Sequence, residues 1–314
     1  MVALNLALQV ACLVVIGAFI RKRNIVDESF ETNLSRFIMN VALPAMIINS
    51  IGKGINSENI GSLWLIWGVS IVFCLAFILL LGHLLFLALG RGHLARVARM
   101  AAFIPNFTFM GIPVISSLYG NAGLVYFNLL VVPVRLTYYL LAKPLLDPTG
   151  GREKTSVKQK LKNIFSPLVV SVIIGLVLGI SGLQLPVFID KTISTLASTC
   201  NALGMVMCGM ILSRVQLKDI FSQPRVFVIT AVRVLVLPAV ALVIMIFVPI
   251  DPMLKKVVIM YCALPAAAMI PSFVVRYDNV PEARTAASVT VFTSTLLCVA
   301  TLPLWYAVVE AVIK

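Results

Sequence analysis

The sequence has few charged residues. Aspartate, glutamate, lysine and arginine together make up 12% of its 314 residues, whereas a soluble domain has about 25%. Hydrophobic residues account for 61%, and the mean hydropathy is +1.05. This composition excludes a mainly soluble protein and leaves little room for a soluble domain. It predicts an all-α membrane protein that crosses the bilayer several times.

Acidic residues are the scarcest charged group. There are 12 of them, against 25 basic residues, and only Glu310 reaches a predicted membrane span, at its outer end. Antiporters that exchange protons or sodium through crossed helices usually have one or two carboxylates in the middle of the membrane. Their absence argues against cation/proton antiport, and it leaves no obvious carboxylate for proton coupling. His83, near the far end of the third span, is interpreted as an interfacial or hydrogen-bonded residue.

Cysteines and catalytic motifs are equally uninformative about chemistry. All six cysteines fall within apolar runs, and none has the close spacing of a zinc or redox site. We therefore expect no disulfide and no metal. The sequence contains no Ser/His/Asp set, no HExxH motif and no phosphate-binding loop. These absences predict a protein that is not an enzyme and that needs no cofactor.

The net charge of +13 could suggest nucleic acid binding, but the basic residues lie in short loops between apolar runs. Seventeen of the 25 basic residues follow odd-numbered spans, five lie on the other side, and three lie within spans. Positively charged loops usually face the cytoplasm. We therefore exclude nucleic acid as a partner, and we expect a plasma-membrane protein of the bacterial inner membrane with both termini outside.

Runs of about 20 mostly apolar residues predict ten spans. We interpret the first run as a span rather than a signal peptide, because its charges follow it and no small-residue cleavage site does. The predicted spans are Ala3–Ile20, Leu34–Ile51, Ile60–Leu81, Ala95–Tyr119, Ala122–Leu141, Ser166–Gly182, Thr192–Leu212, Val226–Val248, Leu254–Tyr277 and Ala286–Val309.

The longest polar loop divides the chain almost in half. This loop, residues 147–163, separates five predicted spans in residues 1–146 from five in residues 164–314. Because five is an odd number, the second half must enter the membrane in the opposite orientation. The sequence therefore predicts two inverted five-helix repeats.

Short matches at a constant offset support this repeat. Ile16-Gly17 matches Ile174-Gly175, and Ile112-Pro113 matches Ile270-Pro271; both pairs are 158 residues apart. Ile and Gly are common in this chain, so one match alone is weak evidence. Two matches with the same offset, in separate spans, favour a true repeat.

The fourth and ninth spans contain residues that break helices. Span four has Pro105 and Pro113, with Asn106 and Gly111 between them, and span nine has Pro265 and Pro271. A proline inside a helix costs about 3 kcal/mol or more, and freed backbone groups cannot remain unsatisfied in lipid. A simple kink would explain one such span. Two breaks at matching repeat positions favour discontinuous helices that cross near mid-membrane, where half-helix N-termini attract an anion.

Four segments resemble the auxin efflux carrier family. They are "NVALPAMI" (Asn40–Ile47), "PNFTFMGIPVISSLYGNAGL" (Pro105–Leu124), "LPAAAMIPSFVVRY" (Leu264–Tyr277) and "TSTLLCVATLPL" (Thr293–Leu304). The resemblance implies a scaffold of spans 1, 2, 6 and 7, and a transport domain of spans 3, 4, 5, 8, 9 and 10. It also implies a homodimer. Unlike many plant exporters the chain has no long central loop, and apolar Met269 and Ile270 precede Pro271 where relatives often have a polar residue. The resemblance therefore does not transfer a particular substrate.

Two arginines within the spans have alternative interpretations. Arg135 and Arg233 each lie about eight residues, or about 12 Å, inside the cytoplasmic end of a span. Each can snorkel or cap the carbonyls of a broken helix, or attract a carboxylate substrate. Pro133 is expected to open span five beside Arg135, which favours Arg135 as the substrate ligand. Arg36 is interpreted as an interfacial anchor.

Three asparagines in apolar surroundings complete the candidate site. Their amides can donate hydrogen bonds to a carboxylate or join helices to one another. The predicted substrate-binding residues are Asn40, Pro44, Asn106, Gly111, Pro113, Arg135, Asn201, Arg233, Pro265, Pro271 and Ser272.

These features predict a secondary carrier that moves an organic carboxylate anion by alternating access, with the anion and membrane lipid as partners. Efflux is favoured, since an interior-negative potential drives an anion outward by about 2.3 kcal/mol per charge per 100 mV. Two alternatives stay open: a sodium- or proton-coupled symporter for a dicarboxylate such as malonate or malate, and a membrane receptor that uses the same pocket without transport.

Overall fold

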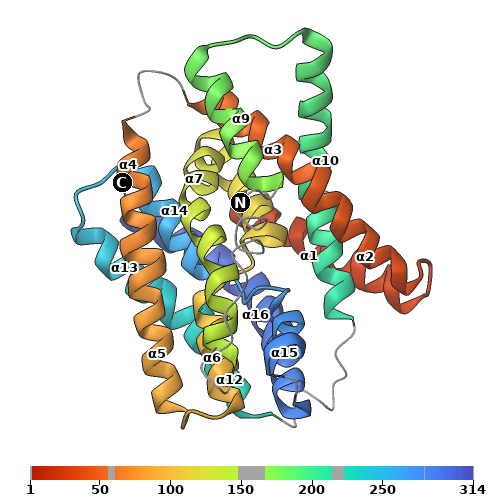
Figure 1. Cartoon of the computed structure of the whole chain (residues 1–314), viewed down its shortest axis with the longest axis vertical. Helices are drawn as coiled ribbons and strands as arrows, with labels where there is room; N and C mark the ends of the chain where they lie inside the picture. Colours follow the sequence, from red (N-terminus) through yellow and green to blue (C-terminus); the bar gives the residue numbers. More distant parts are fainter. Residues whose placement is uncertain (1, 56–60, 148–166, 214–222, 279, 314) are drawn as a thin grey trace.

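The computed structural model describes residues 2–55, 61–147, 167–213, 223–278 and 280–313 (Figure 1). In these ranges the chain is helical apart from connections and one isolated β-bridge. The expected all-α architecture is confirmed. The predicted central loop, 147–163, lies outside the described residues except for Asp147.

The elements follow one another in this order: α1 (Val2–Lys22), α2 (Glu28–Phe37), η1 (Ile38–Ala42), α3 (Leu43–Gly54), α4 (Ser62–Val69), η2 (Ser70–Phe77), α5 (Ile78–Ala88), α6 (His93–Phe103), η3 (Phe107–Gly111), α7 (Ile112–Leu146), α9 (Pro167–Ser181), α10 (Val187–Leu212), α12 (Arg225–Ala231), η4 (Val232–Val236), α13 (Leu237–Phe247), α14 (Pro252–Ala263), α15 (Ile270–Tyr277) and α16 (Pro281–Val312). The elements labelled η are short π-helical segments, most of them inside longer helices.

Several of these helices can cross a membrane. Within the described residues, six helical stretches are long and apolar enough by length and composition, and one of them, Phe107–Tyr138, contains the turn at Gly120: Ser29–Gly54, Leu63–Ala88, Phe107–Tyr138, Val187–Leu212, Arg225–Phe247 and Pro281–Val312. Span nine is divided into α14 and α15, of 12 and 8 residues, and α6 has only 11 residues. Pieces this short cannot cross a core about 30 Å thick individually. The protein is therefore multi-pass, and the ten-span inverted repeat stays a prediction.

Three of the four π-helical segments end directly before an Xaa-Pro pair. The pairs are Leu43-Pro44, Ile112-Pro113 and Leu237-Pro238, which follow η1, η3 and η4. In each case the N–H of the residue before proline donates to a carbonyl five residues back. Proline has no N–H of its own to donate, and a widened turn is a common accommodation in such helices. These wide turns were not predicted, although the prolines marked their positions.

The prediction that Pro133 opens span five is wrong. α7 continues through Pro133, and its only non-helical residue is Gly120, whose φ of 59° turns the chain between predicted spans four and five. The hydroxyl of Ser70, in η2, donates to the carbonyl of Leu130 over 2.6 Å. A neighbouring helix therefore adds a hydrogen bond to a carbonyl in the turn that precedes the proline, within a helix that continues on both sides of it.

Close glycine contacts join α1 to α10 and α3 to α9. A Cβ on Gly17 would lie 2.0 Å from the Val206 carbonyl oxygen of α10, and a Cβ on Gly209 would lie 1.9 Å from the Val14 oxygen of α1. A Cβ on Gly175, in α9, would lie 3.0 Å from the Ile51 side chain of α3. Small residues let membrane helices approach this closely. We call α1, α3, α9 and α10 the scaffold group; Figure 1 shows them together on one side.

The other helices surround the two interrupted segments. In Figure 1, α4, α5 and α13 lie on the side of the molecule away from α1 and α2, while α6, α7, α12 and α16 lie between. Large apolar side chains remain exposed on this outer side, including Trp64 at 78% and Phe247 at 80%. Such continuous apolar surface suits contact with lipid, which agrees with a membrane-spanning chain.

Candidate functional site

The two interrupted segments meet in the interior of the protein. α6 ends at Phe103 and α14 ends at Ala263. Beyond these ends, the Asn106 N–H donates to the Pro265 carbonyl over 2.8 Å, and the Ala267 N–H donates to the Ile104 carbonyl over 3.0 Å. The extended residues thus form a short antiparallel bridge, which we call the crossover. It gives freed backbone groups partners within the protein, as a broken membrane helix requires.

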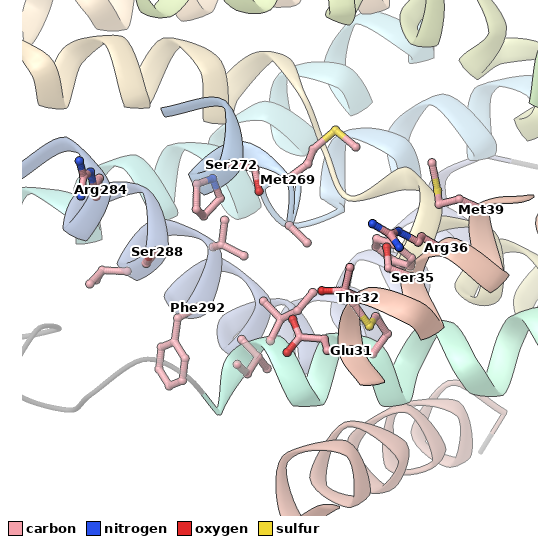
Figure 2. Close-up of a pocket in the computed structure, with 18 of the residues that line it drawn as sticks. Glu31, Thr32, Ser35, Arg36, Met39, Met269, Ser272, Arg284, Ser288 and Phe292 are labelled. Carbon is pink, nitrogen blue, oxygen red and sulfur yellow. The ribbon is translucent and has the colours of Figure 1, made fainter. Parts of the chain in front are cut away.

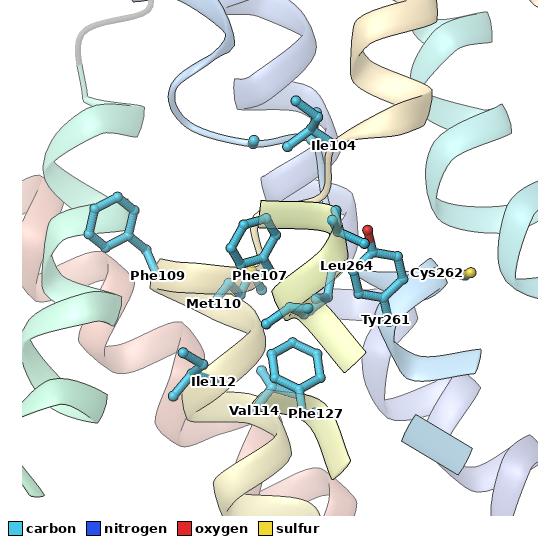
Figure 3. Packing of buried hydrophobic residues seen from close by; sticks show 14 of the residues in the cluster. Ile104, Phe107, Phe109, Met110, Ile112, Val114, Phe127, Tyr261, Cys262 and Leu264 are labelled. Atoms are coloured by element: carbon cyan, nitrogen blue, oxygen red, sulfur yellow. The ribbon is translucent and has the colours of Figure 1, made fainter. Parts of the chain in front are cut away.

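Aromatic and aliphatic side chains enclose the crossover. Figure 3 shows Phe107, Phe127, Tyr261 and Leu264 packed around it, and all four are buried. A Cβ on Gly111 would lie 2.6 Å from the Phe127 ring and 2.7 Å from the Leu264 side chain. A larger residue would force these side chains to move, so glycine allows η3 to lie against both of them.

Arg233, on η4, caps two helix ends at the crossover. Its side chain is completely buried. Nε donates to the Leu264 carbonyl over 2.9 Å, Nη1 to the Ala102 carbonyl over 2.9 Å, and Nη2 to the Tyr261 carbonyl over 3.3 Å. These carbonyls belong to the C-terminal ends of α6 and α14, which carry partial negative charge. Of the two interpretations of Arg233, its contacts are those of the cap.

Both polar atoms of the Asn106 side chain form hydrogen bonds within the protein at the start of η3. Its Oδ1 accepts a hydrogen bond from the Phe109 N–H over 3.2 Å, and its Nδ2 donates to the Cys208 sulfur over 3.5 Å. The residue is only 3% exposed. Asn106 therefore holds the N-terminus of η3 against α10, beside the place where α15 begins.

A cavity of about 620 Å³ lies between the scaffold group and the crossover (Figure 2). It is bounded by α2 and η1, by the end of α10, by the residues before and within α15, and by the first half of α16. Its lining residues are Glu31, Thr32, Ser35, Arg36, Met39, Phe109, Met207, Ile211, Leu212, Ala268, Met269, Pro271, Ser272, Arg284, Thr285, Ser288, Val289, Val291 and Phe292. Its volume is within the usual range for small-molecule sites.

The cavity combines polar and apolar walls. Five hydroxyl groups, from Thr32, Ser35, Ser272, Thr285 and Ser288, line it together with two guanidinium groups and one carboxylate. Methionine and phenylalanine side chains provide apolar surface beside them. A cavity of this kind can hold an organic molecule that has an apolar body and a charged end.

The predicted site residues separate into groups. Pro271 and Ser272 line the cavity, whereas Asn106, Gly111, Pro265 and Arg233 form or support the crossover behind it. Arg135 is 3% exposed, and its guanidinium lies 5.3 Å from the centre of the Phe107 ring, outside the cavity wall.

The remaining predicted residues also lie outside the cavity wall. Asn40 donates from Nδ2 to the Arg36 carbonyl over 2.7 Å, and Pro44 follows η1. Pro113 is buried in the first turn of α7. Asn201, on α10, donates to the Ser116 hydroxyl over 3.3 Å. This bond joins the scaffold group to α7.

Sequence reasoning missed most of the cavity wall. It interpreted Arg36 as an interfacial anchor and assigned no role to Glu31 or Arg284. One signal was present, since Thr32, Ser35, Arg36 and Met39 recur at helical spacing and therefore share one face of the helix that α2 and η1 form. Which helix that face meets depends on the tertiary fold.

A cluster of polar side chains around the buried carboxylate of Asp278 ties the far ends of α6 and α15 together. Asp278 is 2% exposed and accepts hydrogen bonds from Arg96, with Nε 3.0 Å from Oδ2. His93 Nδ1 lies 2.7 Å from the other carboxylate oxygen. The cluster joins the two broken spans at the end opposite the crossover.

Comparison with known proteins shows which family the chain belongs to. Interrupted helices that meet beside a polar cavity are typical of membrane transporters. The sequence matches the family described as "Membrane transport protein" over residues 2–306, and the chain belongs to that family. This is the auxin efflux carrier-like family, so the resemblance inferred from the four segments is confirmed.

Two archaeal relatives cover most of the chain. An uncharacterized transporter of Methanocaldococcus jannaschii is 27% identical over 280 residues, which cover 86% of this chain and 87% of that protein. An uncharacterized transporter of Methanothermobacter thermautotrophicus is 26% identical over 306 residues, or 96% of each chain. Both similarities support a transporter.

Proposed function

We propose that this transporter is a secondary carrier that exports an organic carboxylate anion by alternating access. The observation that carries the proposal is the position of the cavity. It lies directly against the crossover and includes the first turn of α15 in its wall.

The electrostatics of the crossover favour an anion. Arg233 satisfies carbonyls at the C-terminal ends of α6 and α14, so their partial negative charge is offset. The N-termini of η3 and α15 begin beside these ends and carry partial positive charge. Arg36 and Arg284 add two full positive charges to the cavity wall. A carboxylate would meet positive potential both at the wall and at the crossover.

Paired contacts support the inverted repeat that alternating access needs. Gly17 packs on Gly209, and Gly175 packs on Ile51; residues 17 and 175 are 158 apart, and so are residues 51 and 209. In the crossover, residues 104 and 106 bond to residues 267 and 265, and 104 to 265 and 106 to 267 are both 161 apart. On this proposal the scaffold group is the fixed domain and the helices around the crossover move against it, in a homodimer embedded in lipid.

The position of the cavity also supports an orientation of the protein in the membrane. Its residues come from the first part of the helical stretch Ser29–Gly54, from the end of α10 and from the first half of α16. These ends adjoin basic loops that the charge asymmetry assigns to the cytoplasm. We propose that the structure is open to the cytoplasm, with both termini outside the plasma membrane, as an exporter would be when it loads substrate.

Flux measurements test this function. Purified protein in liposomes is expected to move labelled carboxylates down their electrochemical gradient. Movement should be faster when the compartment that contains the anion is electrically negative. Arg36→Gln and Arg284→Gln should each weaken anion binding about tenfold, since one unit of positive charge leaves the cavity wall. Arg135→Gln should weaken it less, because Arg135 is not among the residues that line the cavity.

The same preparation distinguishes the alternatives. Arg225→Gln, which removes an exposed arginine at the start of α12, is the control and should bind like the wild type. Flux that requires sodium or a proton gradient would indicate a symporter. Binding without any flux would indicate a receptor and would contradict the carrier.

Locking α7 to α10 tests alternating access. The Asn201–Ser116 bond lies about 9 Å along α10 from the cavity residue Met207. On the proposed mechanism this contact must separate when the site opens outward. Oxidation of a Ser116→Cys, Asn201→Cys double variant should therefore abolish flux, and a reducing agent should restore it. Each single variant, oxidised in parallel, is the control. Undiminished flux in the cross-linked protein would contradict the mechanism.

A further inference from the structure

Glu31 places a carboxylate in the wall of the cavity for which we propose an anionic substrate. It lies on α2, lines the cavity and is only 7% exposed. Figure 2 shows its side chain, with that of Thr32, on the side of α2 that faces Ser288 and Phe292 of α16. Water screens a charge that is so little exposed less than it screens a surface charge. Glu31 therefore acts on any anion in the cavity.

The charges that face the cavity can be counted. Among the described residues that line it, only Arg36 on α2, Arg284 on α16 and Glu31 are charged. The end of α10, the turn before α15 and Phe109 contribute uncharged side chains. Two positive charges and one negative charge leave the wall with a formal charge of +1. An ion pair between two of these three groups leaves this sum unchanged, because it removes neither charge.

We propose that Glu31 is a specificity-determining residue that excludes a second carboxylate from the substrate. The inference rests on the proposed function and narrows it. One carboxylate neutralises the wall, whereas a dicarboxylate leaves an uncompensated negative charge in a partly desolvated space, close to Glu31. The apolar surface of Met39, Phe109, Met269 and Phe292 suits an uncharged substrate body. The carrier therefore selects monocarboxylates over dicarboxylates of the same length.

Hexanoate and adipate make a matched pair of probes, since both have six carbons and they differ by one carboxylate. Binding to the purified full-length protein is measured by calorimetry at a pH where both are fully ionised, and flux is measured in liposomes. The wild type should prefer hexanoate. Glu31→Gln should bind both more tightly and reduce the preference about tenfold, because the dianion gains more from the lost repulsion.

Glu282→Gln is the control. It removes the same charge from an exposed residue of the first turn of α16, outside the cavity wall, and should keep the wild-type preference. Wild-type protein that binds adipate as tightly as hexanoate overturns the inference, and this comparison needs no variant that folds. An unchanged preference in Glu31→Gln also overturns it. If wild-type protein neither binds nor moves any carboxylate in a wider panel, the proposed function fails instead.

Discussion

Arg233→Leu is expected to lower the free energy of unfolding by about 3 kcal/mol and to abolish transport. The guanidinium donates to three buried carbonyls at the ends of α6 and α14. Hydrogen bonds from a charged group each contribute about 1.5–3 kcal/mol, and a buried acceptor without a partner is expensive. Relief of the buried charge offsets part of this loss. Unfolding in mixed micelles of increasing denaturing-detergent content measures the change.

Arg225→Leu is the matched control, because it makes the same chemical change at an exposed residue eight positions earlier, at the start of α12. It should unfold like the wild type. Arg233→Lys should be intermediate, since an ammonium keeps the charge but lacks the planar fork that reaches both helix ends. Wild-type stability in Arg233→Leu would show that the three carbonyls find other hydrogen-bond donors. It would contradict the role of Arg233 as the cap of the crossover.

Gly209→Ala is expected to lower the free energy of unfolding by about 1–3 kcal/mol, the usual penalty for overpacking. The added Cβ would lie 1.9 Å from the Val14 carbonyl oxygen and 2.9 Å from the Ala18 nitrogen. Both are backbone atoms, so α1 and α10 must separate along their length. Flux should fall with stability, because the scaffold group no longer presents a rigid face to the crossover. Thermal unfolding of the purified protein in detergent reports the change.

Gly68→Ala is the control for Gly209→Ala, because it makes the same substitution where there is no close contact. Gly68 lies in α4, and no heavy atom would approach its added Cβ within 4 Å. Alanine is favoured over glycine in a helix by about 1 kcal/mol, so this variant should be as stable as the wild type or slightly more stable. Equal unfolding midpoints for Gly68→Ala and Gly209→Ala would mean that the close contact of α1 with α10 does not form in solution.

The sequence by itself determined the features that depend on local chemistry. Apolar runs predicted helices in a membrane, because backbone groups must be paired where there is no water. The prolines predicted where the helices break, since Pro105 and Pro265 cannot continue a helix. In the structure α6 and α14 end directly before these residues. The four quoted segments were enough to find the family.

Tertiary structure decided what each polar side chain does. Arg233 had two interpretations that are identical in sequence, and only the convergence of α6 and α14 on its guanidinium distinguishes them. Pro133 carries the same local signal as Pro105. Its helix nevertheless continues, and Ser70, 60 residues away in the chain, donates to the carbonyl of Leu130 in the turn before it.

The cavity shows the same dependence at longer range. Glu31 and Arg36 meet Arg284 only because α2 and α16, from opposite ends of the chain, face one space. Local periodicity reports that a helix has a polar face, but not which helix that face meets. Proline and apolar runs act through the residue's own backbone and its immediate turn, whereas a binding wall is assembled from contacts between distant segments. The breaks could therefore be located from the sequence, and the wall beside them only from the fold.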